Sequence, residues 1–159
     1  PRHPASVPLP PLPDAWGSNG CAQHSKSEQV DADTAMVLGD TMGELTMFLA
    51  AADIVFVGGS LVPVGGHNPL EPAVLGLPII MGPHVFNFAG VDALLAAAGG
   101  RYRVANSADL AATLESLFDD AAMRERAGSQ ALSVVNQHRG AAQRTWQQLT
   151  QHLELTALE

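Results

Sequence analysis

Three glycine-containing loops hold the residues of this sequence whose types and spacing could do chemistry. In the first loop, Thr41 and Glu44 have the spacing of a helix capping box, in which each side chain would bond to the backbone of the other residue. Gly43 would fall inside the first helical turn, where glycine costs about 1 kcal/mol relative to alanine. A glycine there leaves backbone N–H groups open to a phosphate at the positive end of the helix. This loop therefore has two interpretations, a cap and an anion site.

The second loop, residues 58–72, carries two glycine pairs on either side of a hydrophobic bridge. Asn68 would cap a helix in which Pro69 takes the first position and Glu71 the third. Capping does not explain four glycines, which suggest a backbone that turns sharply or lies against a ligand. Glu71 could close the cap or accept hydrogen bonds from sugar hydroxyls, and a carboxylate has enough lone pairs for both.

The third loop, residues 82–88, is most simply a turn with an apolar plug, after which Asn87 caps a helix. His84 could donate a hydrogen bond to an anion. A lone histidine in a loop, however, more often has no catalytic role. The third loop is therefore the weakest of the three as a site.

The usual signatures of cofactor, metal and nucleophile sites are absent from the sequence. No G-x-G-x-x-G stands between a strand and a helix, and there is no P-loop. No cysteine and histidine cluster has metal-ligand spacing, and His67 with Glu71 lacks a third ligand. Ser60 lacks the glycine two positions later that a nucleophile elbow needs. The sequence therefore predicts no metal, no cofactor and no catalytic serine.

The composition indicates one globular domain with an acidic surface. The chain has 159 residues, of which 47% are hydrophobic and 15% charged, as in globular proteins. Its formal net charge of −8 does not indicate the basic surface that nucleic-acid binding needs. The single cysteine, Cys21, excludes an intramolecular disulfide and fits a reducing, cytoplasmic setting. No signal peptide or bilayer-length apolar run is visible. The chain begins at Pro1 without a methionine, and we interpret it as a soluble piece of a longer protein.

The elements that must position these loops alternate along the chain. Short apolar runs predict strands at residues 35–38, 54–57, 78–81 and 101–104. Helical spacing predicts helices at residues 42–51, 69–75, 87–98, 108–118, 121–137 and 141–153. The alternation predicts a three-layer α/β domain whose parallel sheet is covered on both faces. Ligands of such sheets sit beyond the carboxyl ends of the strands, which is where the three loops would lie.

The first part of the chain has a different amino-acid composition. Residues 1–33 are rich in proline and in small and polar residues, and they are expected to be irregular, either extended or mobile. Residues 34–159 are expected to form the α/β domain.

Several motifs in the same order and spacing resemble one family, the 3-deoxy-D-manno-octulosonic acid (Kdo) transferases, which move Kdo from CMP-Kdo to the lipid A precursor in lipopolysaccharide biosynthesis. The motifs that carry the resemblance are Pro1-Arg2-His3-Pro4, residues 38–45, residues 56–61, Gly65-Gly66-His67-Asn68, Leu70-Glu71-Pro72, and Gly82-Pro83-His84 with Asn87-Phe88. The resemblance covers residues 27–153 and the first four residues. It departs from the family at residues 4–13, where prolines stand in place of a helix.

The resemblance implies a GT-B glycosyltransferase of which this chain is the C-terminal, Rossmann-like, donor-binding half. By resemblance, the residues that contact CMP are Pro1, Arg2, Met42, Gly43, Glu44, Asn68, Pro69, Leu70 and Glu71. The family's general base and acceptor site belong to an N-terminal domain, so no catalytic residue is assigned here and the chain alone is expected to be inactive. The resemblance also implies a parent protein associated with the cytoplasmic face of the bacterial inner membrane.

Two other functions stay open at this point. One is another GT-B nucleotide-sugar enzyme, and the other is a non-catalytic nucleotide-binding module that uses the same fold. An oxidoreductase fits least, because the dinucleotide fingerprint is missing. The apolar stripe of the last predicted helix, with Trp146, Leu149 and Leu153, could make the isolated chain a homodimer.

Overall fold

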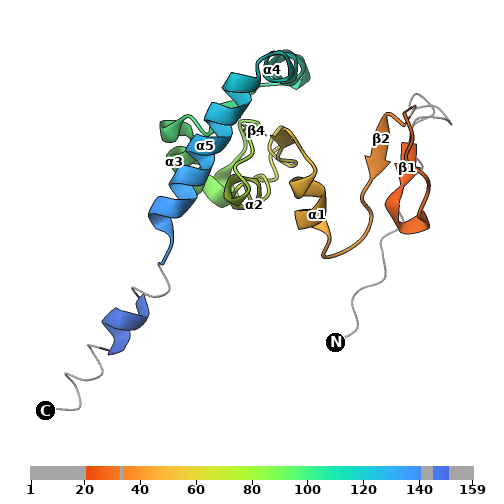
Figure 1. The fold of residues 1–159 in the computed structure, drawn as a ribbon. Coiled ribbons are helices and arrows are strands. Elements are labelled where there is room, and N and C mark those ends of the chain that lie inside the picture. The colour runs from red at the N-terminus through yellow and green to blue at the C-terminus, as the bar shows by residue number, and fades with distance from the viewer. Residues whose placement is uncertain (1–20, 33, 141–144, 151–159) are drawn as a thin grey trace, which may run out of the picture. The chain divides into compact units, whose positions relative to one another are not determined.

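The computed structural model describes residues 21–32, 34–140 and 145–150 (Figure 1). The chain divides into two compact units, Pro1–Phe48 and Leu49–Glu159, and each is described by itself. The predicted boundary between residues 33 and 34 stays a prediction.

The first unit contains a pair of short parallel strands. Strand β1 (Cys21–Gln23) pairs with β2 (Met36–Leu38), with Cys21 opposite Met36. A 3-10 turn, η2 (His24–Lys26), follows β1 directly. Strand β2 was predicted, whereas β1 was not, because its three residues show no alternation of apolar and polar side chains. The structure therefore adds a partner for β2 inside the stretch that was expected to be irregular.

The second unit is a three-stranded parallel sheet with β4 in the middle, in the order β3-β4-β5. Its strands are β3 (Val55–Phe56), β4 (Ile79–Met81) and β5 (Arg101–Arg103). Its helices are α2 (Leu70–Val74), α3 (Ala89–Ala98), α4 (Ser107–Asp119) and α5 (Ala121–His138), with a 3-10 turn η3 (Phe86–Phe88) before α3. Strands alternate with helices along the chain, so the predicted parallel α/β class is confirmed.

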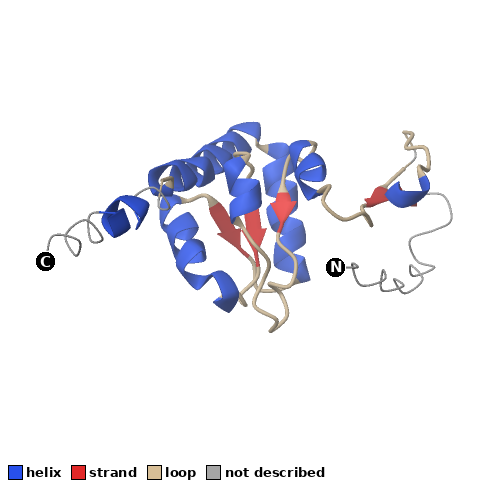
Figure 2. Ribbon diagram, turned by 90° about the horizontal axis from the view of Figure 1, so that it is seen from below, coloured by secondary structure: helices blue, strands red, loops and turns tan. Residues whose placement is uncertain are grey.

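The sheet is buried on both faces, because the side chains of β4 point alternately to two separate cores. Ile79 and Met81 pack with Leu95 of α3 and Ala131 of α5. Ile80 packs on the other face with Leu117 of α4. All three side chains of β4 are fully buried. Figure 2 shows helices on both sides of the strands, which is the predicted three-layer arrangement.

Helix α5 packs against α2, α3 and α4, and its contact with the end of α2 is very close. A Cβ atom added to Gly128 in the middle of α5 would lie 1.9 Å from the carbonyl oxygen of Gly76. The guanidinium of Arg124 also donates to the carbonyl oxygens of Leu117 and Phe118, the last turn of α4. These contacts hold α5 in one register across the unit.

A buried ion pair joins β5 to α3. The Nη2 atom of Arg101 lies 2.6 Å from Oδ2 of Asp92, and the two side chains are only 7% and 9% exposed. The other oxygen of Asp92 and Nε of Arg101 are buried without a partner among the described residues. The pair is therefore incompletely satisfied, and each charge depends strongly on the other.

The described helices differ from the predicted ones mainly at their ends. The helix expected at residues 42–51 is α1 (Leu45–Ala50), which starts three residues later than predicted. Of the helix expected at residues 141–153, residues 145–150 are helical and the remainder lies outside the described residues. Within the part of the chain that is described, no helix is both long enough and apolar enough to cross a bilayer.

Candidate functional site

The turn before α1 holds the first group of predicted site residues. Gly43 has φ of +88°, which is the left-handed region, and a Cβ atom there would meet nothing within 4 Å. Glycine is therefore needed for the backbone conformation and not for space. Helix α1 begins at Leu45, so Gly43 lies before the helix. The expectation that it lies inside the first turn is wrong.

Glu44 stands at the start of α1. Its carbonyl oxygen accepts from the N–H groups of Met47 and Phe48, at 2.9 and 3.3 Å. The hydroxyl of Thr41 donates directly to Oε2 of Glu44. The two residues therefore meet side chain to side chain, and the predicted capping box, in which each side chain bonds to backbone, is not formed. Its absence leaves the N–H groups of Glu44 and Leu45 without a partner among the described residues.

In the turn before α2, Asn68 accepts the predicted bond from the start of the helix, although α2 itself begins at Leu70, one residue later than predicted. Oδ1 of Asn68 accepts from the N–H of Leu70 at 3.0 Å, and Nδ2 of Asn68 donates to Oε1 of Glu71 at 3.2 Å. Pro69 is buried with φ −83° and ψ −8°, which is helical backbone. Asn68 and Glu71 are thus fixed relative to each other, and Oε2 of Glu71 keeps its hydrogen-bonding capacity.

The loop between β3 and α2 closes on itself through its backbone. The N–H of Gly66 donates to the carbonyl of Gly59 at 3.0 Å, and the N–H of His67 donates to that of Gly58 at 3.2 Å. Gly59, Gly65 and Gly66 all have positive φ. The glycines therefore make the sharp turn that the sequence indicated, and they present main chain at the end of β3.

Ser60 is fully buried under this loop. Its hydroxyl donates to the carbonyl of Val57 at 2.5 Å and accepts from the N–H of Gly82 at 2.8 Å. Both bonds engage backbone groups, so Ser60 is a structural residue.

Asn87 does not cap a helix, contrary to the prediction. Its side chain donates to the carbonyl oxygens of Val64, at 3.1 Å, and Gly66, at 3.5 Å. The residue next to α3 is Phe88, which offers no side-chain cap. Asn87 lies within η3, one residue before the cap position of α3, and instead braces the glycine loop.

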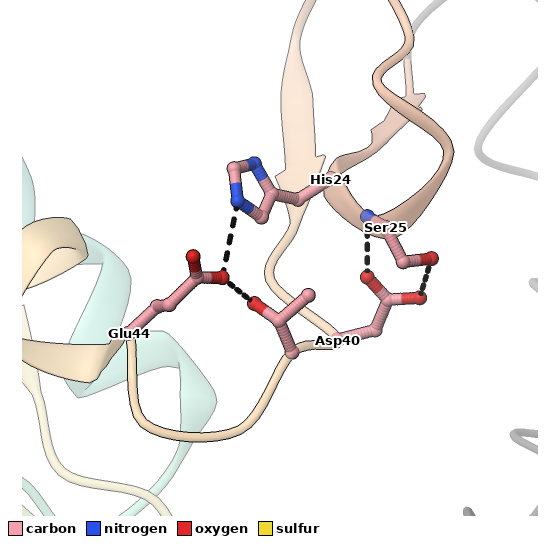
Figure 3. Close-up of polar contacts among 5 residues, drawn as sticks. His24, Ser25, Asp40 and Glu44 are labelled. Atoms are coloured by element: carbon pink, nitrogen blue, oxygen red, sulfur yellow. Dashed lines mark hydrogen bonds and ion pairs between the residues drawn. The ribbon is translucent and has the colours of Figure 1, made fainter.

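Sequence reasoning missed a polar cluster around Glu44, drawn in Figure 3. Nε2 of His24 lies 3.2 Å from Oε2 of Glu44. Asp40 accepts from the backbone and hydroxyl of Ser25, at 2.9 and 2.6 Å, and from the side chain of Gln23 at 2.5 Å. The hydrogen bonds from the Ser25 hydroxyl and the Gln23 amide hold the pKa of Asp40 well below its ordinary value. Asp40 therefore stays ionised and ties the turn that carries His24 to the loop that leads to Glu44.

The remaining predicted site residues are placed as follows. Met42 is 90% exposed and Leu70 36% exposed. Pro1 and Arg2 lie outside the described residues. Met42, Gly43 and Glu44 belong to the first unit, and Asn68, Pro69, Leu70 and Glu71 to the second. Among the described residues, no group of three or more histidine, cysteine, aspartate and glutamate side chains could hold a metal ion.

Comparison with known proteins adds a family likeness to this geometry. No protein-family model matches the chain. It is 41% identical over 133 residues to the 3-deoxy-D-manno-octulosonic acid transferase of Haemophilus influenzae, covering 83% of this chain and 31% of that protein. It is 32% identical over 150 residues to the enzyme of the same name from Bordetella pertussis, covering 91% and 34%. The chain thus spans about a third of the length of these curated relatives.

A solved structure has the same fold. The crystal structure of the C-terminal CMP-Kdo binding domain of WaaA from Acinetobacter baumannii matches with a TM-score of 0.71 and 30% sequence identity. The match covers 74% of this chain and 61% of that one. The fold is therefore that of the C-terminal half of a GT-B protein.

Proposed function

Because the chain belongs to the 3-deoxy-D-manno-octulosonic acid transferase family, we propose that it is the domain that binds the CMP-Kdo donor in a glycosyltransferase. The observation that carries this proposal is the likeness in both fold and sequence to a domain described as binding CMP-Kdo. The chain would bind the donor, and the acceptor, the lipid A precursor, would bind to a further domain of a longer protein. That protein would act at the cytoplasmic face of the inner membrane.

The residues proposed to contact CMP differ in charge, and their charge indicates which part of the nucleotide each would bind. A phosphate would be repelled by the carboxylates of Glu44 and Glu71, so these side chains suit ribose hydroxyls or the cytosine amino group. The phosphate suits the open N–H groups of Glu44 and Leu45 and the guanidinium of Arg2. Helices α1 and α2 have six and five residues, so individual N–H groups matter here more than a helix dipole.

The chain is proposed to contribute positioning and electrostatics to transfer, and no general base. Glu44 is engaged by Thr41 and His24, and Glu71 by Asn68. Both carboxylates are therefore held as hydrogen-bond acceptors for a ligand. No metal and no other cofactor is part of the proposal.

Titration of the chain with CMP, UMP and UDP, followed by NMR, tests this function. CMP is expected to shift the amide resonances of residues 42–44 and of Asn68, Leu70 and Glu71, with weaker effects of UMP. A preference for UDP would favour another GT-B nucleotide-sugar enzyme. The absence of any shift up to about 5 mM CMP would refute the proposal. Transferase turnover by the chain alone would contradict the proposed division of labour between domains.

Homodimerisation of the chain also stays a proposal. Trp146 and Leu149 are 63% and 52% exposed on the helical residues 145–150. Burying such side chains against a second copy would remove apolar surface from water. Sedimentation that shows a monomer at all concentrations would contradict the proposal.

A further inference from the structure

We propose that His24 is a positioning residue that fixes the Glu44 carboxylate to accept the vicinal hydroxyls of the ribose, an inference that rests on the proposed function. Nε2 of His24 lies 3.2 Å from Oε2 of Glu44 (Figure 3). The chain's sequence motifs assign nothing to His24, which lies outside the residues proposed to contact CMP.

The two donors to Glu44 share one carboxylate oxygen. Thr41 and His24 both reach Oε2, whereas Oε1 has no partner among the described residues. A carboxylate offers about four lone-pair positions, two on each oxygen. Oε1 is therefore the oxygen left to a ligand. Hydroxyl groups suit it because they can donate, whereas a phosphate would bring a second negative charge.

His24 is itself held from three directions. Its ring makes an edge contact with Phe48, with centroids 5.2 Å apart and planes at 79°. Its carbonyl oxygen accepts from the N–H of Ser27 at 2.9 Å, which closes the turn. The neighbouring residues Gln23 and Ser25 are both bonded to Asp40. The imidazole is thus presented to Glu44 by a braced turn, and not by a free surface side chain.

This bracing matters because Glu44 is not buried. The side chains of His24 and Glu44 are 36% and 43% exposed. An exposed glutamate samples many rotamers, and a ligand that selects one of them must overcome that freedom. Fixing the carboxylate beforehand lowers this cost and so raises affinity. In the neutral imidazole with hydrogen on Nε2, His24 supplies the required donor.

A pair of variants of the full chain separates this role from general packing. His24→Leu removes the donor, whereas His24→Gln keeps an N–H group close to the position of Nε2. Each protein is titrated with CMP and with 2′-deoxy-CMP. The wild-type chain is expected to prefer CMP by about tenfold. His24→Leu is expected to lose most of this preference with little change for 2′-deoxy-CMP, and His24→Gln is expected to restore it.

The outcomes are distinguishable. A wild-type chain that binds no cytidine nucleotide refutes the proposed function and this inference with it. Normal CMP preference in His24→Leu refutes the inference alone. Equal losses for CMP and 2′-deoxy-CMP in both variants also refute it, because they indicate a packing role.

A measurement on the wild-type protein covers the case in which His24→Leu does not fold. Imidazole ¹⁵N shifts report the hydrogen bond that each histidine makes. CMP is expected to move the shift of His24 more than 2′-deoxy-CMP does. His138 is the internal reference, because its Nδ1 contacts the carbonyl of Val134 in α5. Identical shifts of His24 with the two nucleotides would overturn the inference.

Discussion

The buried hydroxyl of Ser60 accepts a hydrogen bond from the N–H of Gly82 at 2.8 Å, which ties the loop after β3 to the loop after β4. The carbonyl of Ser60 accepts a second bond, from the N–H of His84 at 2.9 Å. The carboxyl end of the sheet, where parallel α/β sheets usually bind ligands, is therefore built on a contact between two loops. It follows that the stability of these loops can be changed without touching a proposed ligand-binding side chain.

Replacing Ser60 with alanine is expected to lower the free energy of unfolding by about 1–3 kcal/mol, because the buried N–H of Gly82 loses its acceptor. Urea unfolding followed by circular dichroism measures this. Ser116→Ala is the matched control, since Ser116 is exposed and bonds only to a carbonyl of its own helix. Its effect is expected to stay within about 0.5 kcal/mol. Equal losses in the two variants would contradict the role given to Ser60.

Two glycines in helices are expected to respond oppositely to alanine. Gly128→Ala places a Cβ atom 1.9 Å from the carbonyl oxygen of Gly76, so α5 must move. A loss of about 1–3 kcal/mol or more is expected from such overpacking. Gly90→Ala in α3 meets nothing within 4 Å and is expected to raise stability by up to about 1 kcal/mol. Thermal unfolding of both variants checks this, and stabilisation by Gly128→Ala would contradict the observed packing.

Breaking the buried ion pair is expected to be costly. Asp92→Ala leaves the guanidinium of Arg101 buried and unpaired, and a loss of about 3–5 kcal/mol is expected. The double variant Asp92→Leu with Arg101→Met replaces the pair with apolar side chains. It is expected to recover most of the loss, because no charge remains to be desolvated. Urea unfolding of the single and double variants gives both values, and a double variant less stable than Asp92→Ala would overturn this account.

The charge of Glu71 is expected to matter for nucleotide binding. Glu71→Gln keeps the shape and an acceptor oxygen but removes the negative charge, and charge-assisted hydrogen bonds are the stronger ones. We expect CMP affinity to fall by about five- to tenfold, measured by calorimetry. Glu115→Gln, an exposed site on α4, is the control and is expected to have no effect. Unchanged CMP affinity in Glu71→Gln would remove Glu71 from the proposed site.

Asp40 is expected to remain ionised in acid. Its pKa in the folded unit lies below its ordinary value of 3.8, so the ionised form favours the folded state. The contribution is fully present above the ordinary pKa and is lost only as the pH falls through the lower, folded value. The carboxyl ¹³C shift of Asp40 is therefore expected to stay constant from about pH 6 to about pH 3, below the ordinary pKa of an aspartate carboxyl. A titration midpoint of Asp40 at or above the ordinary aspartate value would contradict the three hydrogen bonds that it accepts.

The sequence predicted the sheet of the second unit well, because buried parallel strands leave continuous apolar runs between helical segments. It predicted correctly that the Asn68 side chain bonds to the start of α2, since the partners of Asn68 lie only two and three positions away. It failed at Asn87, whose partners lie more than 20 residues away. It also missed the cluster around His24, because Asp40 bonds to Gln23 at the end of the unpredicted strand β1 and to Ser25 just after it. Sequence patterns therefore predicted contacts between residues close together in the chain, and missed contacts between residues far apart in it.

The tie between Ser60 and Gly82 has a consequence for how this protein tolerates mutation. A Cβ atom on Gly82 would lie 2.2 Å from the carbonyl oxygen of Ser60, and Gly65 and Gly66 are buried. Loops usually absorb substitutions that strands and helices reject. Here the loops after β3 and β4 leave as little room as β4 itself. In a saturation library, the buried residues Ser60, Gly65, Gly66 and Gly82 would group with the hydrophobic core, whereas exposed residues 62–64 and the outer faces of α4 and α5 would carry the permissive positions.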